Sequence, residues 1–532
     1  MKMKKLLAIT LVALTTFVTA ACGNSSTSKS SKDKETSTKE AIKDGGSLVF
    51  SIRGEPEILN PIYAYDRDTM TMNNALFAPL FYMNGDKIDY TLAEDVKHSD
   101  DFLIYTVKLK KDLKWHDGKP LTADDLIFTM KQIMDEKQDS HLRSAFVIND
   151  KLVDVKKIDD LTVEFKLPEV QIPFMNSLAQ VSPIPKHIFE GEKEIKKSAK
   201  NEKPIGSGPF KFKESKKGES ITLEKFDNYV GGKPHLDTIT YRIIADPNSS
   251  RVALENAEIS ANYIDISGIS KFEKNEKLKV VAYDEGMVDN LVLNCKTKGL
   301  DKKEVRQAIA YALNKDDLIK AAYESQKYAP KAYSPLPKNA LYYTDDVHKY
   351  DLNKDKAKEL MKKSGVENLK LKLVYRNDKK TLENQALVVK ENLKDIGIDV
   401  ELKGLEANAF FQQFDEPDKA DFDLIFNGYV MGSEPDAYKE IFMTGGAFNA
   451  SRYTNKTLDN LWNKGAVETD KAKREAIYKN IQKELMEDMP LYPICYSNAT
   501  IAVNKNVGGI KEAKTAPIYM FQDLSKLYII EE

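Results

Sequence analysis

The sequence predicts an α/β protein that is divided into at least two lobes. Its 532 residues exceed the roughly 250–300 that a single hydrophobic core usually supports. The apolar pattern over residues 350–402 runs helix, strand, helix, strand, an order that is typical of an α/β lobe. The composition, 42% hydrophobic and 9% aromatic, is that of an ordinary globular chain.

The segment 350–402 justifies the α/β prediction element by element. A helix carries Ala357, Leu360 and Met361 on one face and ends at Gly365, which suits the left-handed position after a helix. An alternating strand over 369–375 follows. The next helix and strand are marked by apolar residues at the same two spacings, namely Ala386, Val389, Leu393 and Ile396, then Val400 and Leu402.

Earlier parts of the chain carry further elements. Residues 47–52 form a strand that the turn 53–56 stops, and residues 102–109 alternate as a second strand. A helix is expected to start after Thr122, with Asp125 completing a capping box.

The N-terminal stretch is predicted to be a processing signal. Lysines at 2, 4 and 5 precede an apolar run over 6–21, which ends in small residues before Cys22. This stretch resembles a bacterial lipobox, which implies removal of residues 1–21 and acylation of Cys22, with palmitate among the expected modifications. An ordinary secretory signal with an incidental cysteine is the alternative. Residues 22–45, rich in Ser, Thr and Lys, should be a flexible tether.

Charge and motif spacing argue against several classes of protein. Eighty basic residues are interspersed among 82 acidic ones, so no basic stripe for nucleic acid is expected. The six histidines show no ligand spacing and are expected at the surface or in turns. The segment 206–208 lacks the pattern of a nucleophile elbow. Abundant carboxylates leave a hydrolase open. Cys295 and Cys495 are expected to be free thiols in a core large enough to need no disulfide.

Several segments resemble the extracellular solute-binding proteins of peptide ABC transporters, a family that includes oligopeptide- and dipeptide-binding proteins and nickel-binding relatives. The segment from His116 to Asp125, HDGKPLTADD, carries the resemblance, and so does EVRQAIAYALNK from Glu304 to Lys315. The other segments follow in the family's order: 92–95, 204–210, 350–365, 396–400 and 474–490.

The resemblance implies a two-lobed periplasmic-binding-protein-like fold of type II, in the large peptide-binding class, with a hinge between the lobes. Lobe one would comprise residues 46–285, with an inserted subdomain at about 75–200, and lobe two residues 286–500. Residues 501–532 would return to lobe one. The crossings are expected near 283–288 and 496–502.

In this family the ligand lies between the lobes, so the resemblance also implies walls on both sides. The first wall would be the loop Arg53, Gly54, Glu55 and Pro56. The second wall would be Asn427, Gly428, Tyr429, Val430, Met431, Gly432, Ser433, Glu434 and Asp436. A third group is Tyr375, Arg376 and Asn377. No catalytic residue, metal ligand or cofactor is implied.

The second wall departs from the family at one position. Peptide-binding members have an aspartate four residues before the proline, where it pairs with the peptide's α-ammonium; here that residue is Met431. A buried ammonium without a carboxylate is costly. Either the protein grips peptides mainly through their backbone, tolerating longer or N-blocked ligands, or it has moved to another ligand. Glu434 or Asp436 is a possible substitute anchor.

The function implied is capture of peptides and their delivery to a membrane permease pair driven by an ATPase. The protein would act as a monomer, without enzymatic activity, lipid-anchored on the outer face of a cell membrane and in a Gram-positive cell. The alternatives are a binder of a nickel chelate or another small solute, a peptide-pheromone receptor or surface adhesin on the same fold and, more distantly, a secreted hydrolase.

Overall fold

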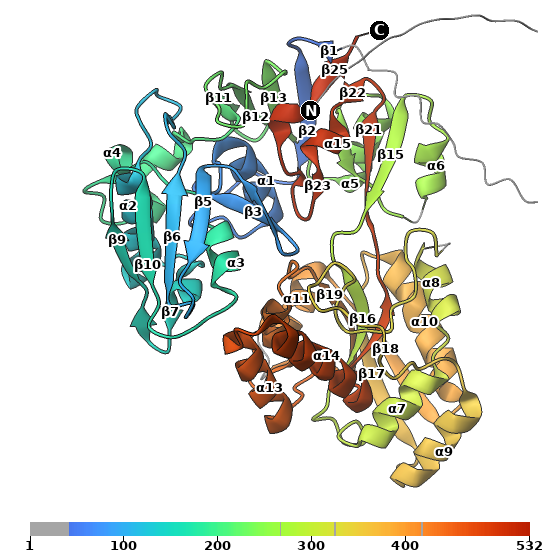
Figure 1. The fold of residues 1–532 in the computed structure, drawn as a ribbon. Helices are drawn as coiled ribbons and strands as arrows, with labels where there is room; N and C mark the ends of the chain where they lie inside the picture. Colours follow the sequence, from blue (N-terminus) through green and yellow to red (C-terminus); the bar gives the residue numbers. More distant parts are fainter. Residues whose placement is uncertain (1–41, 267, 324–325, 416–418, 532) are drawn as a thin grey trace, which may run out of the picture. The chain divides into compact units, whose positions relative to one another are not determined.

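The computed structural model describes residues 42–531, apart from 267, 324–325 and 416–418. These residues belong to one compact unit. The predicted signal peptide, the lipidation site Cys22 and nearly all of the predicted tether lie outside the described residues. Within the described part, two large sheets and one smaller sheet organise the chain (Figure 1).

A five-stranded mixed sheet is covered by helices on both faces. Its strands in order are β18 (Ile398–Leu405), β17 (Leu369–Arg376), β19 (Leu424–Tyr429), β16 (Val288–Leu293) and β20 (Leu491–Cys495). Along β16, Leu291 and Leu293 join one core while Val292 joins another. Because successive side chains in a strand point to opposite faces, both faces of this sheet are buried.

Two groups of helices supply these cores. The first comprises α7 (Lys303–Ala312), α8 (Lys315–Tyr323), α9 (Lys354–Ser364) and α10 (Lys380–Lys394). The second comprises α11 (Ala407–Asp415), α12 (Lys439–Phe442), α13 (Lys456–Val467) and α14 (Lys471–Asp488). This helix–sheet–helix layering is the α/β arrangement that the sequence predicts.

A seven-stranded sheet forms the second large layer. Its strands in order are β11 (Phe210–Lys216), β12 (Ser220–Lys225), β13 (Thr238–Ile243), β2 (Ser47–Ile52), β14 (Ala261–Tyr263), β21 (Ala499–Asn504) and β15 (Leu278–Tyr283). One face packs on α1 (Arg67–Leu76) through Phe50 and Met72. The other face carries α5 (Pro247–Glu255) and α6 (Ile269–Glu273).

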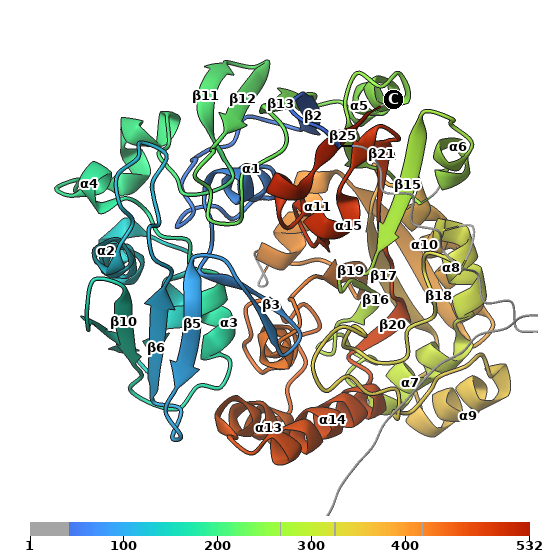
Figure 2. The same cartoon turned by 45° about the horizontal axis from the view of Figure 1, so that its top comes forward.

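A four-stranded antiparallel sheet has a core of its own. Its strands are β5 (Ala93–His98), β6 (Ile104–Leu109), β10 (Thr162–Lys166) and β9 (Asp154–Lys157). Helices α2 (Ala123–Met134), α3 (Phe174–Ala179) and α4 (Lys186–Phe189) pack against it around the buried Trp115 and Phe165. The sheet and its helices form one side of the ribbon in Figure 2.

Short elements complete the structure. They are β1 (Ile42–Lys43), β3 (Phe81–Asn84), β4 (Lys87–Tyr90), β7 (Val147–Ile148), β8 (Lys151–Leu152), β22 (Val507–Gly508), α15 (Ile510–Ala513), β23 (Thr515–Ala516), β24 (Met520–Phe521) and β25 (Tyr528–Ile530).

The chain passes twice between the two large sheets. β15 ends at Tyr283 in the seven-stranded sheet and β16 begins at Val288 in the five-stranded one. The return runs from Cys495, the end of β20, to Ala499, the start of β21. β21 therefore returns to the sheet that contains β2, and the last strand, β25, pairs with the first, β1.

Several local predictions can be checked directly. The capping box at Thr122 and Asp125 is confirmed, and α9 ends at Gly365 with a φ of +65°. The strand predicted from residue 102 begins later, at Ile104, because Phe102 has a φ of +56° in a turn that the Asp101 carboxylate closes. The two thiols, Cys295 and Cys495, are free, as predicted.

Candidate functional site

The first wall follows an edge of the seven-stranded sheet next to the crossings. β2 pairs in parallel with β14, and both β14 and β15 pair antiparallel with β21. β2 and β15 therefore run in the same direction, and their carboxyl ends share one edge. Because β15 leads into the first crossing, the loop that follows β2 from Arg53 lies along the edge at which the chain leaves for the other sheet.

The second wall and the third predicted group lie at one end of the five-stranded sheet, the end at which the chain enters from the first crossing. β17 and β19 are parallel, so Tyr375 and Tyr429 lie near the same end of that sheet. β16 runs antiparallel to β19, and its first residue, Val288, pairs with Tyr429. The crossing thus enters the sheet beside the second wall. All three predicted groups lie at strand ends that flank the crossings.

In the first wall, the polar groups differ in how firmly they are held. The backbone N–H of Arg53 donates to the Asp68 carboxylate at 3.1 Å, while its guanidinium lies 3.8 Å from the same group and is largely exposed. Glu55 accepts a hydrogen bond from the backbone N–H of Gly218 at 2.7 Å. A Cβ on Gly54 would meet no other atom within 4 Å. The wall therefore offers an accessible cation and open space beside it.

The second wall begins as a strand and continues as a braced loop. Gly428 permits a close approach, because a Cβ there would lie 2.6 Å from the Met287 sulfur and 3.1 Å from the Val288 carbonyl oxygen. At Gly432 the φ is +78°, and the Tyr438 hydroxyl donates to its carbonyl at 3.1 Å. This close approach holds the loop against the crossing segment.

The two acidic residues of the second wall are both paired with other side chains of the protein. Glu434 is buried and pairs with the Arg474 guanidinium at 2.6 Å. Asp436 is buried as well, accepts from the Tyr478 hydroxyl at 3.0 Å and pairs with Lys439 at 3.1 Å. Although burial opposes it, the Glu434 carboxylate raises the pKa of Arg474 above its ordinary value. Neither acid presents a free carboxylate to a ligand.

Glu434 also joins the wall to the four-stranded sheet's subdomain. The Asn176 side-chain amide on α3 donates to the second Glu434 oxygen at 3.3 Å. Nearby, the backbone N–H of Ile172 donates to the Ala466 carbonyl at 2.9 Å. The wall is therefore supported from the subdomain as well as from α14.

The third predicted group is also internally paired. Arg376 forms two hydrogen bonds to Asp378, and its guanidinium lies over the Phe411 ring at 5.4 Å from the ring centre. Asn377 donates its backbone N–H to Leu405 at 3.0 Å. The side chain of Phe411 is half exposed, so this end of the sheet presents a planar, partly apolar surface.

The structure adds a group of charged residues at the crossing that sequence reasoning passed over. Arg67 on α1 donates to the Ile518 carbonyl at 3.1 Å, and its guanidinium lies 3.8 Å from Glu285. Burial raises the pKa of Glu285 and that of Asp289, whose carboxylate accepts from the Tyr323 hydroxyl. The sequence has three acidic residues within the seven residues 284–290, and this density of charge could have indicated the group.

His116 lies in a turn, as predicted, but its side chain is buried rather than exposed. Its Nδ1 accepts from the Gly206 N–H at 3.0 Å, and its Nε2 donates to the Gly208 carbonyl at 3.1 Å. A Cβ on Gly208 would lie 2.5 Å from the Ala75 carbonyl oxygen. The segment 204–210 therefore packs closely against His116 and against α1 in the interior of the protein.

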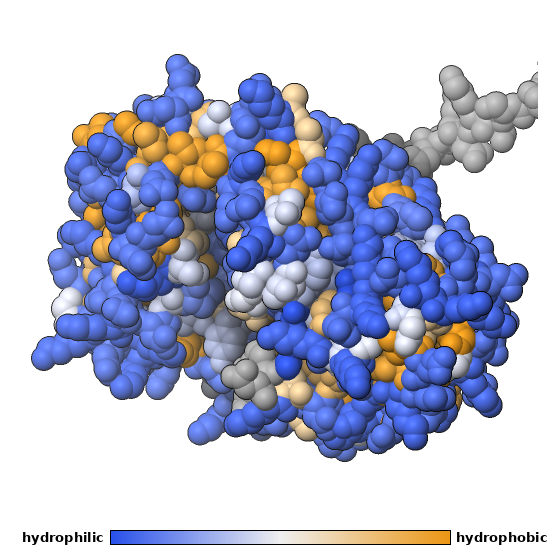
Figure 3. Space-filling model, turned by 90° about the horizontal axis from the view of Figure 1, so that it is seen from below, coloured by the Kyte–Doolittle hydropathy of each residue, from blue (hydrophilic) through white to orange (hydrophobic). Residues whose placement is uncertain are grey.

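The described residues contain neither a metal-ligand cluster nor a helix that could span a membrane. Within 42–531, apart from the gaps given above, no group of three or more His, Cys, Asp or Glu side chains is arranged to hold a metal ion. No helix in this part of the chain is long and apolar enough to cross a membrane. Figure 3 shows one face of the molecule, on which hydrophilic side chains predominate and apolar ones gather in separate patches.

The class of protein follows from the fold and from a family match. Residues 87–450 match the model of the bacterial extracellular solute-binding proteins, family 5 Middle. The chain belongs to this family, and the fold is the two-lobed fold of its members.

Individual relatives cover nearly the whole chain. The oligopeptide-binding protein AppA of Bacillus subtilis is 32% identical, over 96% of each chain. A structure of the ABC transporter substrate-binding protein CtaP from Listeria monocytogenes is 46% identical, with a TM-score of 0.89, and the match covers 92% of this chain and 100% of that one. A structure of B. subtilis AppA in complex with a nonapeptide is 30% identical with a TM-score of 0.76, covering 92% and 100%.

Proposed function

We propose that this protein is the solute-binding component of an ABC importer and that it captures peptides between its two lobes. The convergence of strand ends carries the proposal: the segments after β2, β17 and β19 all lie at sheet edges beside the crossings. A ligand placed there would touch both lobes at once. The structure of B. subtilis AppA with a nonapeptide supports peptide as the ligand class.

The proposed mechanism is capture without chemistry. A peptide bridges the walls, and bending at the two crossing segments closes the lobes because only the closed state makes both sets of contacts. Extended peptides gain affinity from main-chain hydrogen bonds, which do not depend on sequence. The closed protein then delivers its ligand to a permease pair and its ATPase. Family membership as a solute-binding protein supports a role without turnover.

We infer further that the ligand's α-ammonium is not held by a carboxylate of the second wall. Met431 stands at the family's anchor position, and both Glu434 and Asp436 are engaged by partners within the protein. Binding should then depend mainly on backbone contacts.

Titration calorimetry with one nonapeptide as the free amine and as its N-acetyl form tests peptide capture and this inference together. Both forms should bind with affinities that agree within about threefold, since a lost charge-assisted anchor would change affinity by at least tenfold. A loss of tenfold or more on acetylation would contradict the inference. Failure of a varied peptide set to bind at all would contradict the proposed function.

The domain organisation belongs to the same proposal. Lobe one comprises 46–285, including the subdomain at about 75–200, together with 501–532, and lobe two comprises 286–500. The strand membership of the two large sheets supports this division. The crossings then act as the hinge.

We also propose that the mature protein is a monomer anchored by a lipid on Cys22 at the outer face of a cell membrane. The sequence of residues 1–22 supports this proposal. Detergent phase partition should place the wild type in the detergent phase and Cys22→Ala in the aqueous phase. Equal partition of both proteins into the aqueous phase would contradict the anchor.

A further inference from the structure

The subdomain at about 75–200 reaches across to lobe two through one backbone bond and one side chain. The Ile172 N–H donates to the Ala466 carbonyl at 2.9 Å. Ala466 lies in the last turn of α13, where carbonyls have no partner within the helix, so this bond satisfies an acceptor of the other lobe. The Asn176 amide on α3 donates to Glu434 of the second wall at 3.3 Å.

A charge pair joins the same two parts of the molecule. Asp86, in the turn between β3 and β4, lies 3.2 Å from the Lys471 ammonium at the start of α14. Both side chains are more than half exposed. Such a pair contributes little by itself and is weakened by salt, so it can form and break readily.

No apolar core reinforces these polar contacts. Among the described residues, every side chain in the subdomain's core around Trp115 and Phe165 comes from before residue 231, so none belongs to lobe two. Polar groups exchange protein partners for water at a small net cost, whereas a packed apolar surface resists separation. The subdomain and lobe two can therefore part without disrupting a core.

The lobes meet differently on the side of the crossings. There Tyr328 of lobe two is buried with Ile266 and Ile269 of lobe one, and its carbonyl accepts from the Asn498 N–H at 2.9 Å. Figures 1 and 2 both show α13 on the side of lobe two that faces the subdomain, while the chain crosses below β15 and β21 on the other side. The apolar contact thus lies near the crossings and the polar contacts lie away from them.

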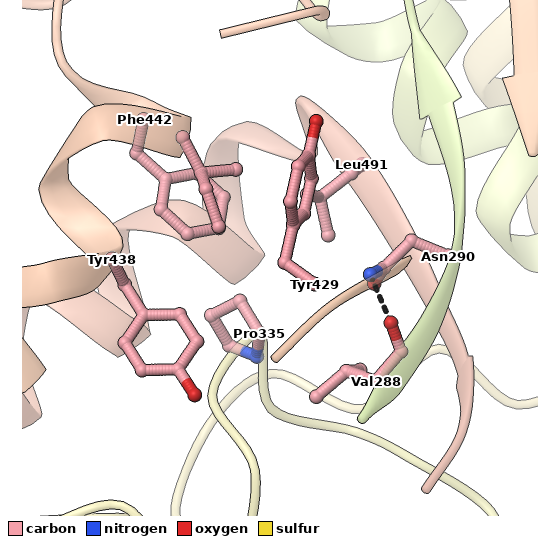
Figure 4. Close-up of a pocket in the computed structure, with 8 residues that line it drawn as sticks. Val288, Asn290, Pro335, Tyr429, Tyr438, Phe442 and Leu491 are labelled. Carbon is pink, nitrogen blue, oxygen red and sulfur yellow. Dashed lines mark hydrogen bonds between the residues drawn. The ribbon is translucent and has the colours of Figure 1, made fainter. Parts of the chain in front are cut away.

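The start of β16 is firmly joined to the second wall. Val288 pairs with Tyr429, and the Asn290 side-chain amide donates to the Val288 carbonyl at 2.6 Å, the bond drawn in Figure 4. Bending at the crossings therefore moves the wall together with β16. Such a motion would carry Glu434 away from Asn176.

We propose that Ile172, Asn176 and Asp86 form a latch with lobe two, which closes the ligand site on the side away from the crossings and opens before a peptide enters or leaves. This inference rests on the proposed function. Opening leaves Glu434 paired with Arg474, so it strands no buried charge. Because the latch exists only in the closed state, it slows release of the ligand without touching it.

Hydrogen exchange at the Ile172 amide reports the latch, because this N–H exchanges when its bond to lobe two opens. The mature protein is measured at low salt, with and without a nonapeptide of alternating alanine and serine. Saturating peptide should slow exchange at Ile172. Asp86→Lys, which sets a like charge against Lys471, should speed exchange about two- to fivefold and should speed peptide release in stopped flow by a similar factor.

A charge swap and a matched control separate the latch from general effects. Asp86→Lys combined with Lys471→Asp should restore the wild-type exchange and release rates. Lys483→Asp, also on α14, sets a like charge against Asp346 within lobe two and should change neither rate. All four side chains are substantially exposed, so the substitutions leave the cores intact.

Each outcome has a separate meaning. Exchange at Ile172 that responds neither to peptide nor to Asp86→Lys would overturn the latch, because the contact would then be permanent. Rates that the charge swap does not restore would overturn the role of the Asp86 pair. If the folded wild type binds no peptide of a varied set, the proposed function fails. Exchange at Ile172 in the ligand-free variants would still decide whether the latch opens.

Discussion

At the residue scale, His116 shows how a family motif serves the fold. The motif is visible in the sequence from His116 to Asp125, but the reason for the histidine lies in its two ring nitrogens, which bond Gly206 and Gly208 across about ninety residues of chain. The neutral ring satisfies both groups. Burial lowers the pKa of His116 to about 4.

This depressed pKa predicts a pH-dependent stability. The unfolded chain binds a proton near pH 6.5 and the folded protein only near pH 4, so the free energy of unfolding should fall as the pH drops between these values. The loss is roughly 3 kcal/mol over that range. Urea unfolding of the wild type and of His116→Gln at pH 7, 5.5 and 4.5 measures it.

The variant should be less stable at pH 7 and should show a shallower decline with acid. His98→Gln, at an exposed histidine, is the control and should keep the wild-type slope. An unchanged slope in His116→Gln would refute the assignment.

At the element scale, the second wall is held by side chains from other elements. Glu434 caps the N–H of Asp436 and pairs with Arg474 on α14, forty residues later. Asn176 of the subdomain reaches the same carboxylate. The loop is therefore a braced element, and its shape depends on a buried ion pair.

Removing one partner should be costly, because the other charge stays buried. Glu434→Ala leaves the Arg474 guanidinium, whose side chain is 4% exposed, without its carboxylate, and unfolding should require about 3–5 kcal/mol less free energy. Chemical denaturation measures this loss. Lys483→Ala, which breaks the exposed pair with Asp346, should cost under about 1 kcal/mol. Equal losses in the two variants would contradict the bracing role.

Sequence reasoning predicted elements better than the contacts between them. The capping box at Thr122 and the end of α9 at Gly365 follow from local chemistry and are confirmed. The partners of Glu434 and His116 could not be predicted, because they come from distant segments. Phe102 was misplaced for a local reason, since an alternating pattern does not reveal a turn with positive φ.

At the scale of the whole molecule, the two crossing segments determine where the predicted walls lie. They run beside the strand ends that carry the three predicted walls, and they include Glu285, whose carboxylate lies 3.8 Å from the Arg67 guanidinium. The length of the chain predicts at least two lobes and the family resemblance predicts the binding-protein fold, while periodicity alone indicates only an α/β lobe.

Binding should make the protein more compact. If a peptide bridges both lobes, the radius of gyration in small-angle scattering should fall when a tightly bound nonapeptide is added and should return when the ligand is removed. Matched free lysine and alanine should have no effect. A radius that is unchanged at saturating peptide would contradict closure around the ligand.

Native mass spectrometry of freshly purified protein tests peptide capture most directly. The account predicts protein ions that carry a distribution of bound masses, which denaturation releases as a ladder of peptides. A single discrete mass that is not a peptide would contradict it and assign the protein another ligand.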